Sequence, residues 1–377
     1  MNVLIGADIV PTPSNETLFR KGDGVALVGE ELIALLNSAS YRIMNLETPL
    51  CEKNNPILKC GPNISAPTET INGYKALNIN LLTLANNHIL DQGEEGLQST
   101  LEILKTNHID YVGVGDVSTA SSPLYFHVNA TKYGVYACAE NEFSIVSPRR
   151  KGANPYDQIY SYEHVSRMKE NCDYIIVLYH GGKEFYRYPS PMLQKYCRRF
   201  IEVGANLVIC QHSHCIGCEE QYNDGTIVYG QGNFLFDYGD NEYWNTGLLI
   251  GIEEGPEVIY IPIQKKGNAV RMASKKDSEE IMKDFYKRSE EIKDGQFLID
   301  KYDAFSQKLL ESYFERSAGK IRKSLLFRII NKIYGGHLVL NNYGIDEYLS
   351  LENMIECEAH REVFLNGLKN IITRKGT

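Results

Sequence analysis

Short runs of apolar and β-branched residues recur along the first part of the chain at the length of buried strands. The clearest runs cover residues 3–5, 41–44, 81–84, 111–114, 174–178 and 207–209. Between several of these runs apolar residues recur at helical spacing, as Leu97, Leu101 and Leu104 do. This alternation predicts an α/β core with helices outside the sheet.

Further strand candidates have shorter connections between them. They cover residues 124–129, 134–138, 227–230, 247–252 and 258–263. Neighbouring parallel strands need a crossover of about a dozen residues or more, so short connections favour antiparallel pairing. We therefore expect mixed sheets.

The composition of the sequence changes near residue 275. From Lys275 onward, charged residues and helix formers dominate almost to the C-terminus. We predict a domain boundary here, with an α/β domain over residues 1–275 and an all-α appendage over residues 276–377. Its helices are expected near residues 278–292, 297–315, 319–333 and 345–373.

Composition narrows the classes of function. The chain has 377 residues, of which 43% are hydrophobic and 23% charged, as in an average soluble globular protein. With 39 Lys+Arg against 48 Asp+Glu, its formal net charge is −9. Because that field repels phosphate backbones, we expect no nucleic-acid partner.

The cysteines and the first residues bear on the compartment. The nine cysteines are an odd number without framework spacing, which indicates free thiols in a reducing compartment. The first residues lack the features of a secretion signal. No apolar run approaches the about 20 residues that a membrane-spanning helix needs. We expect a cytoplasmic protein.

Polar residues stand at the ends of five predicted strands. Each has an ordinary structural explanation alone, such as a helix cap for Asp8 or a turn at Asn87 and His88. In open α/β sheets, however, the carboxyl ends of strands meet at one crevice, where ligands bind. The residues at these ends are Asp8, Asn45, Glu47, Asn86, Asn87, His88, His180, His212 and His214.

Imidazoles, carboxylates and an amide oxygen together form a ligand set suited to Mn, Fe or Zn. The strand ends offer more such groups than one tetrahedral ion requires. A two-metal centre is therefore expected, in which the ions activate a water molecule and neutralise charge on a phosphoryl group.

Six short motifs follow one another in an order that resembles a known family. They are Gly6-Ala7-Asp8, Asn45-Leu46-Glu47, Leu84-Ala85-Asn86-Asn87-His88, His180-Gly181-Gly182-Lys183-Glu184, Gln211-His212-Ser213-His214 and Gly230-Gln231-Gly232-Asn233-Phe234. Over residues 1–265 the chain is similar to the bacterial capsule-synthesis proteins of the CapA, poly-γ-glutamate type. That family resembles calcineurin-like metallophosphoesterases, which implies an αββα sandwich with mixed sheets.

The resemblance also implies a distribution of metal ligands. One ion takes Asp8 and His214, the second takes Asn87, His180 and His212, and Glu47 bridges the two.

Two residues depart from the phosphoesterase pattern. The bridging position is usually an Asp after Gly, whereas here Glu47 follows Asn45-Leu46, as in the capsule family. The first motif usually carries a ligand His two residues after its Asp, and here that residue is Val10. The first ion is therefore expected to be weakly held or absent.

The remaining motif residues are given roles around the substrate. The resemblance makes His88 a general acid with Asp91 as its orienting partner. Asn45, Glu184 and Asn233 fit no ligand position, so we assign them to substrate binding or to support of the ligands.

Two local alternatives stay open. Cys215 and Cys218 form a Cys-x-x-Cys pair beside the histidines, which is one way to hold a structural zinc. In the C-terminal region, cations including Arg328 and Lys332 interleave with Leu325 and Ile329 at helical spacing. Such a helix can lie on an anionic membrane surface, although packing onto the main domain is the favoured interpretation.

The sequence therefore predicts a metal-dependent phosphoester, amide or ester hydrolase in the biosynthesis of a poly-γ-glutamate or polysaccharide capsule. Its partners are expected to be a capsule intermediate and other capsule-assembly proteins. The alternative is a non-catalytic scaffold of such an assembly with a degraded metal site.

Overall fold

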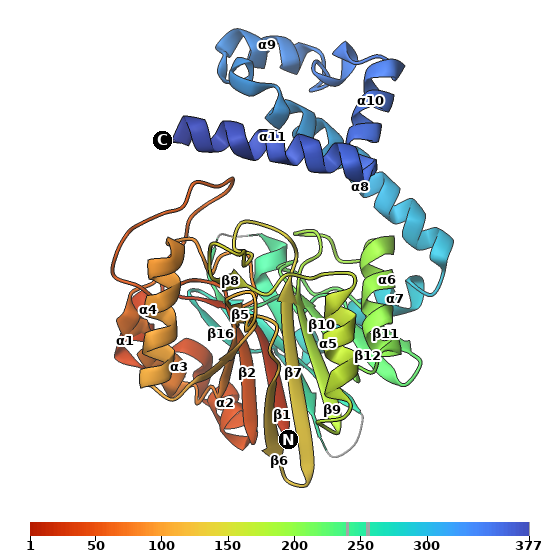
Figure 1. The fold of residues 1–377 in the computed structure, drawn as a ribbon. Helices are drawn as coiled ribbons and strands as arrows, with labels where there is room; N and C mark the ends of the chain where they lie inside the picture. The colour runs from red at the N-terminus through yellow and green to blue at the C-terminus, as the bar shows by residue number, and fades with distance from the viewer. Residues whose placement is uncertain (239–240, 254–256, 377) are drawn as a thin grey trace. The chain divides into compact units, whose positions relative to one another are not determined.

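Two mixed β-sheets lie face to face at the centre of the N-terminal part of the chain (Figure 1). The computed structural model describes residues 1–238, 241–253 and 257–376. Its contacts divide the chain into two units, Met1–Leu298 and Ile299–Thr377.

The first sheet has the strand order β16-β15-β14-β1-β2-β3-β4, with β13 also pairing with β1. Strands β1 to β4 are parallel, whereas β14, β15 and β16 pair antiparallel. The bounds are β1 Val3–Val10, β2 Tyr41–Leu46, β3 Leu81–Thr83, β4 Asp110–Val112, β13 Asn233–Phe236, β14 Thr246–Ile252, β15 Val258–Lys266 and β16 Ala269–Met272.

The second sheet has the order β11-β12-β10-β9-β7-β6 and is also mixed. Its bounds are β6 Leu124–Val128, β7 Thr131–Ala139, β9 Tyr174–His180, β10 Leu207–Gln211, β11 Glu219–Tyr222 and β12 Gly225–Val228. A separate short ribbon pairs β5 (Val114–Gly115) with β8 (Gly152–Ala153).

Helices cover the outer faces of both sheets (Figure 1). Those on the first sheet are α1 Glu16–Lys21, α2 Gly24–Ser38, α3 Ile71–Ala76 and α4 Gly93–Thr106. Those on the second sheet are α5 Tyr160–Met168 and α6 Pro191–Glu202. Two 3₁₀ turns, η1 (Thr68–Thr70) and η2 (Glu242–Asn245), lie between the strands of the first sheet in the sequence. The predicted αββα sandwich with mixed sheets is confirmed.

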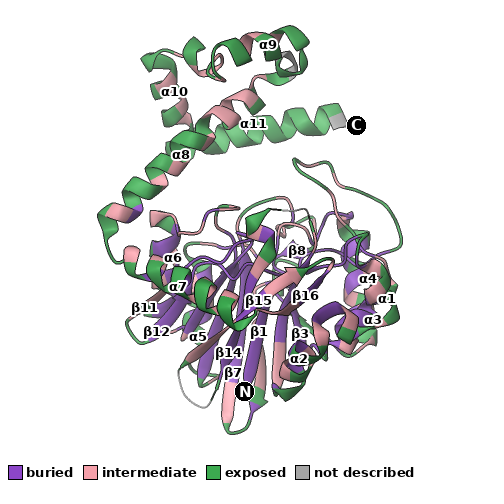
Figure 2. Ribbon diagram, turned by 180° about the vertical axis from the view of Figure 1, so that it is seen from behind, coloured by how far each residue is buried: buried purple, intermediate pink, exposed green. Residues whose placement is uncertain are grey.

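The alternation of side chains along the strands explains the layers. On β1, Val3 and Ile5 enter the core between the sheets, while Leu4 enters the core beneath the helices. Because successive strand residues point to opposite faces, an apolar run can be buried on both. Figure 2 shows the central strands almost wholly buried.

A pair of glutamines connects the two sheets inside the sandwich. The Gln211 amide on β10 donates to Gly6 O at 3.1 Å and to Gln231 Oε1 at 3.1 Å. The Gln231 amide in turn donates to Ile5 O at 2.9 Å and to Leu248 O at 3.0 Å. Both glutamines are buried, so these bonds hold the sheets in one register near the strand ends.

The C-terminal region is helical, as predicted. Its bounds are α7 Lys275–Glu291, α8 Gly295–Ser317, η3 Gly319–Lys323, α9 Leu325–Ile333, η4 Leu340–Asn342, α10 Ile345–Glu356 and α11 Glu358–Gly376. The single helix predicted over residues 345–373 is wrong, because Cys357 leaves the helical conformation with φ −69° and ψ 119° and separates α10 from α11.

The helices begin where the boundary was predicted, but the division into units falls later, after Leu298. The reason is that α7 packs on the sheets: Phe285 of α7 is buried in the core between them. Among the described residues, no helix is both long enough and apolar enough to cross a bilayer.

Replacing Gln231 with Leu tests the connection between the sheets. We expect a loss of about 1–3 kcal/mol in unfolding free energy, because buried carbonyls lose their donor. Urea unfolding of the metal-free protein measures the loss. The control is Gln98→Leu on the exposed face of α4, where Gln98 bonds only Glu102, and it should change stability by less than about 0.5 kcal/mol. Equal losses in the two variants would contradict the assignment.

Candidate metal centre

Strand ends from both sheets meet at one place. Asp8 on β1 and Asn45 on β2 pair in register in the first sheet, and the Asn45 amide donates to Asp8 Oδ1 at 2.7 Å. The same amide nitrogen lies 3.3 Å from Nδ1 of His180, the last residue of β9 in the second sheet. The ends of β1, β2 and β9, three of the five predicted strand ends, therefore lie close together.

Two overlapping groups of ligand side chains lie at this place. One contains Glu47, His180 and His212, and the other contains Asp8, Glu47 and His214. Within each group one potential ligand atom per residue lies within 4.8 Å of the others, and all these residues are buried. Glu47 belongs to both groups.

Asn87 joins the first group. Its Oδ1 lies 3.1 Å from His180 Nε2, which is itself 3.3 Å from Glu47 Oε1. The structure thus brings together every residue to which the sequence assigned a metal, although the coordination itself stays a prediction.

Irregularities of the backbone set the directions of the Asp8, His212 and His214 side chains. The pairing of β1 with β2 shifts register between Ile5 and Asp8, a bulge that redirects the Asp8 side chain. His212 and His214 both have positive φ, 88° and 54°. Non-glycine residues rarely adopt this conformation, and where it occurs it clusters at functional sites. It lets two alternate residues after β10 present imidazoles to the same groups.

The donor set fits a divalent cation. Among the described residues, the buried atoms Asp8 Oδ2, Glu47 Oε1, Glu47 Oε2 and His212 Nδ1 have no hydrogen-bond partner. Burying carboxylate oxygens without partners is costly unless a cation compensates them. Carboxylate oxygens beside imidazole nitrogens are the ligands that Mn, Fe and Zn accept.

Burial sets the protonation of the centre. Burial, with the nearby Glu47 carboxylate, raises the pKa of Asp8 to about 7. Burial also raises the pKa of Glu47 to about 7. Burial lowers the pKa of His180 to about 4 and holds the pKa of His212 well below its usual value. Both imidazoles are therefore neutral near pH 7, as ligands must be.

An apolar wall stands where the phosphoesterase pattern has a ligand histidine. Val10 is buried against Phe236 and Trp244. The Trp244 ring stacks on His214, with centroids 4.5 Å apart. The group around Asp8 therefore has three potential protein ligands, with an apolar neighbour at the position of a fourth.

Next to the ligand groups His88 and Asp91 form a hydrogen-bonded pair. His88 Nδ1 lies 2.6 Å from Asp91 Oδ2, and Asp91 is fully buried. The backbone N–H of Ile64 also donates to Asp91 Oδ2, at 2.8 Å. Asp91 is thus within hydrogen-bonding distance of the imidazole, and its role in orienting His88 stays a prediction.

Lys59 is a third residue in contact with His88 and Asp91, and the sequence did not predict it. Its ammonium group forms an ion pair with Asp91 Oδ1 and lies 3.3 Å from His88 Nδ1. The Lys59 side chain is only 2% exposed. It comes from a stretch rich in Pro, Gly and Asn that reads as a surface loop, so nothing in the pattern marks it.

Of the other predicted residues, Asn233 contacts a potential ligand and Glu184 acts on one through its charge. Asn233 pairs in register with Asp8, and its Oδ1 lies 2.9 Å from His214 Nδ1. Glu184 is partly buried and its charge adds to the rise in the pKa of Glu47, which burial dominates. Glu140, also missed, accepts from the backbone N–H of Gly182 at 3.0 Å and so holds the loop after His180.

The cysteine alternative gains no support. Cys215 and Cys218 are buried, and Cys218 belongs to the apolar core beneath α6. Across the part of the chain that the structure describes, no cluster of three metal-ligating side chains includes a cysteine. Both thiols have raised pKa values because of burial, which disfavours thiolate ligation.

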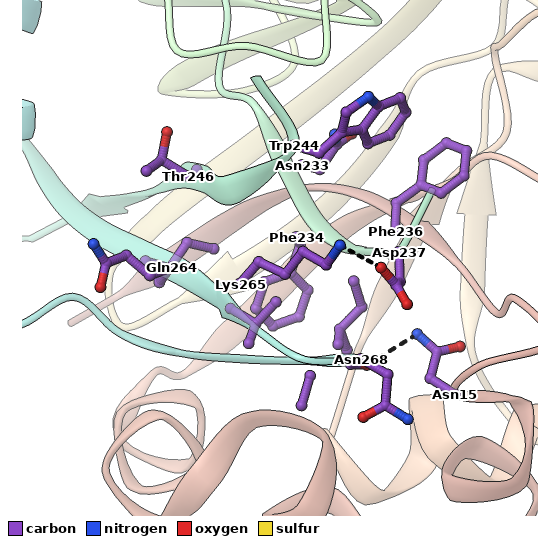
Figure 3. A pocket seen from close by; sticks show the side chains of 15 residues that line it. Asn15, Asn233, Phe234, Phe236, Asp237, Trp244, Thr246, Gln264, Lys265 and Asn268 are labelled. Carbon is purple, nitrogen blue, oxygen red and sulfur yellow. Dashed lines mark hydrogen bonds and ion pairs between the residues drawn. The ribbon is translucent and has the colours of Figure 1, made fainter. Parts of the chain in front are cut away.

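A small pocket adjoins the centre behind β13 (Figure 3). Asn233 and Trp244 form part of its lining. Lys265 pairs with Asp237 at 2.5 Å, and Asn15 donates to Asn268 O at 3.3 Å. The Lys265–Asp237 pair holds the chain directly after β13, and the Asn15–Asn268 bond joins the segment after β1 to the turn before β16.

Comparison with known proteins identifies relatives of the N-terminal part. The model of the family described as "Bacterial capsule synthesis protein PGA_cap" matches residues 6–238. The capsule biosynthesis protein CapA of Bacillus anthracis is 28% identical over 226 residues, which cover 57% of this chain and 55% of that protein. The PGA biosynthesis protein CapA of Bacillus subtilis is 26% identical over 210 residues, covering 54% and 55%. The matched region is thus little more than half the length of each relative.

A solved structure also matches part of the chain. It is described as a novel phosphatase of Mycoplasma pneumoniae, with a TM-score of 0.41 and 14% identity, and the match covers 71% of this chain and 89% of that one.

Metal affinity should depend on pH. Below about pH 7 the Asp8 and Glu47 carboxyls carry protons that a cation must displace. Mn²⁺ affinity should therefore rise by about tenfold per pH unit for each displaced proton, and by up to about a hundredfold for both, between pH 5.5 and 7, and then level off. Calorimetric titration of the metal-free protein measures it. Glu47→Gln should weaken binding by at least about tenfold, and the exposed control Glu52→Gln should not. An affinity independent of pH would contradict the assignment.

Removing the Lys59 ammonium should destabilise the protein. Lys59→Met leaves the buried Asp91 carboxylate without its cation, and breaking such a pair costs about 3–5 kcal/mol. The matched control is Lys53→Met, since Lys53 pairs with Glu95 at 3.2 Å on the surface with both side chains mostly exposed. That pair contributes about 0–1 kcal/mol. Chemical unfolding compares the two, and similar losses would show that Lys59 is not held as described.

Proposed function

The chain belongs to the family of bacterial capsule synthesis proteins, and on that premise we propose that it is a metal-dependent hydrolase of phosphoesters in capsule biosynthesis. The observation that carries the proposal is the position of Glu47, shared by two groups of ligands beside the His88–Asp91 pair. An amide or ester bond is the nearest variant of the substrate.

The ligand groups divide between two divalent ions. Asp8 and His214 would hold one ion, Asn87, His180 and His212 would hold the other, and Glu47 would be shared by both. Such ions polarise a phosphoryl oxygen and lower the pKa of a bound water. Because Val10 replaces a ligand, the ion at Asp8 is the more weakly held. Mn, Fe and Zn all suit these donors.

His88 moves the proton. Since its Nδ1–H donates to Asp91, Nε2 is the nitrogen left to exchange a proton with the substrate. In the proposed reaction Nε2 protonates the departing oxygen. Asp91 keeps the ring in this orientation and tautomer, and Lys59 holds the Asp91 carboxylate through their ion pair. The orphaned oxygens of Asp8 and Glu47 exclude an anionic substrate until cations are bound.

The biological substrate is proposed from the family. Its relatives are named for capsule and PGA biosynthesis, which supports an intermediate of a poly-γ-glutamate or polysaccharide capsule and partners in capsule assembly. All nine cysteines are free thiols, in keeping with the proposed cytoplasmic location.

The role of His88 can be tested with leaving groups of different basicity. In added Mn²⁺, His88→Ala should lower kcat about 10²–10⁴-fold for an alkyl phosphate. The loss should be much smaller for p-nitrophenyl phosphate, whose leaving group needs no proton. Steady-state kinetics of the two substrates measure the contrast. Exposed His127 on β6 provides the control His127→Ala, which should leave both rates unchanged.

Metal content completes the test. Two ions per chain with this leaving-group pattern support the proposal. No bound metal and no turnover favour the alternative, a capsule-assembly scaffold, for which the apolar neighbour Val10 is the supporting feature. Equal losses on both substrates would remove His88 from its role as acid.

A further inference from the structure

The helix α9 exposes an apolar face to solvent. Leu325 is 71% exposed, Leu326 67%, Ile329 50% and Ile333 76%. At 100° per residue these four positions fall within one sector of the helix. The opposite side, with Phe327, is less exposed. Aliphatic side chains of this size are normally covered by protein or lipid.

Cations border this face. Arg328 and Lys332 lie on α9 beside Leu325, and Arg322 and Lys323 lie in the preceding turn η3; all four are exposed. The sequence has no Asp or Glu between Glu315 and Asp346. In a chain with a net charge of −9, this is a local reversal of sign.

The same cations line a hollow between α8 and α9. Its lining includes Arg316, Arg322, Lys323, Arg328 and Lys332. Glu315, its one acidic residue, is hydrogen-bonded by Asn331. The hollow is therefore suited to anionic groups.

We propose that α9 and η3 form a docking surface for a membrane rich in anionic lipids. The aliphatic face enters the boundary between headgroups and acyl chains, and the cations contact the headgroups. Charge selects this occupant: the neighbouring helix α10 also exposes Ile345 and Leu349 but carries only acidic charges, among them Asp346 and Glu347. This surface is independent of the proposed hydrolase activity.

Co-sedimentation of the full chain with vesicles tests the proposal. We expect binding to phosphatidylcholine vesicles containing about 30% phosphatidylglycerol, and much weaker binding to phosphatidylcholine alone. Replacing Arg322, Lys323, Arg328 and Lys332 together with Gln should lower the partition coefficient about fivefold per residue, since each cation contributes about 1 kcal/mol at the surface. Ile329→Ser with Ile333→Ser should also weaken binding.

The control removes the same charge elsewhere. Lys75, Lys105, Lys169 and Lys195 are exposed on the first unit, and changing all four to Gln should leave vesicle binding within about twofold of the original. Circular dichroism confirms that each variant is folded. Absence of binding to anionic vesicles, or equal losses in the two quadruple variants, would overturn the proposal. So would a concentration-dependent dimer that the α9 serine variant abolishes, because the face would then cover a second copy.

Discussion

Two buried carboxylates that face each other without a compensating charge are the constraint around which the rest of the N-terminal unit is arranged. Asp8 and Glu47 are removed from water, and three of their oxygens have no hydrogen-bond partner among the described residues. An apolar core does not tolerate such a pair unless it is protonated or bound by a cation. The neutral imidazoles of His180 and His212 and the nearby amides can supply ligands but no charge. The arrangement therefore lowers the stability of the metal-free chain, and the proposed cations would compensate for this loss.

Unusual backbone keeps that arrangement in place. The bulge in β1 costs conformational energy. The left-handed conformations of His212 and His214 cost about 1–3 kcal/mol each. Hydrogen bonds from the surroundings stabilise these conformations. Phe185 N, for example, donates to Ser213 O, between the two histidines, at 2.8 Å. Val10 shows the opposite tendency, because there a position suited to a ligand has become part of a hydrophobic cluster with Trp244.

The sequence predicts the sandwich well because its strands carry an unambiguous signal. Runs such as 174–178 are continuous and apolar, and parallel order follows from the helices between them. The location of the polar residues at strand ends is equally predictable, because the direction of a strand decides at which edge of the sheet its last side chains lie. Lys59 and Trp244 were not predictable, because they reach the centre from irregular segments whose path depends on tertiary packing. Short strands such as β13 and β16 were missed for a related reason: Asn233 and Arg271 interrupt the apolar pattern. The break between α10 and α11 at Cys357 was not predictable either, because no proline or glycine marks it in the sequence.

Each ligand group draws side chains from both sheets, with Asp8 and Glu47 on one side and His180, His212 and His214 on the other. An ion held in either group is consequently a cross-link between the two halves of the sandwich, parallel to the buried glutamine pair. The spacing of the potential ligands is set by how the halves are docked, and coordination bonds of the proposed ions would resist any shear between them. The stiffness of this edge of the molecule would then depend on its metal load, and amide hydrogen exchange along the ends of β1 and β9 would report occupancy without any substrate.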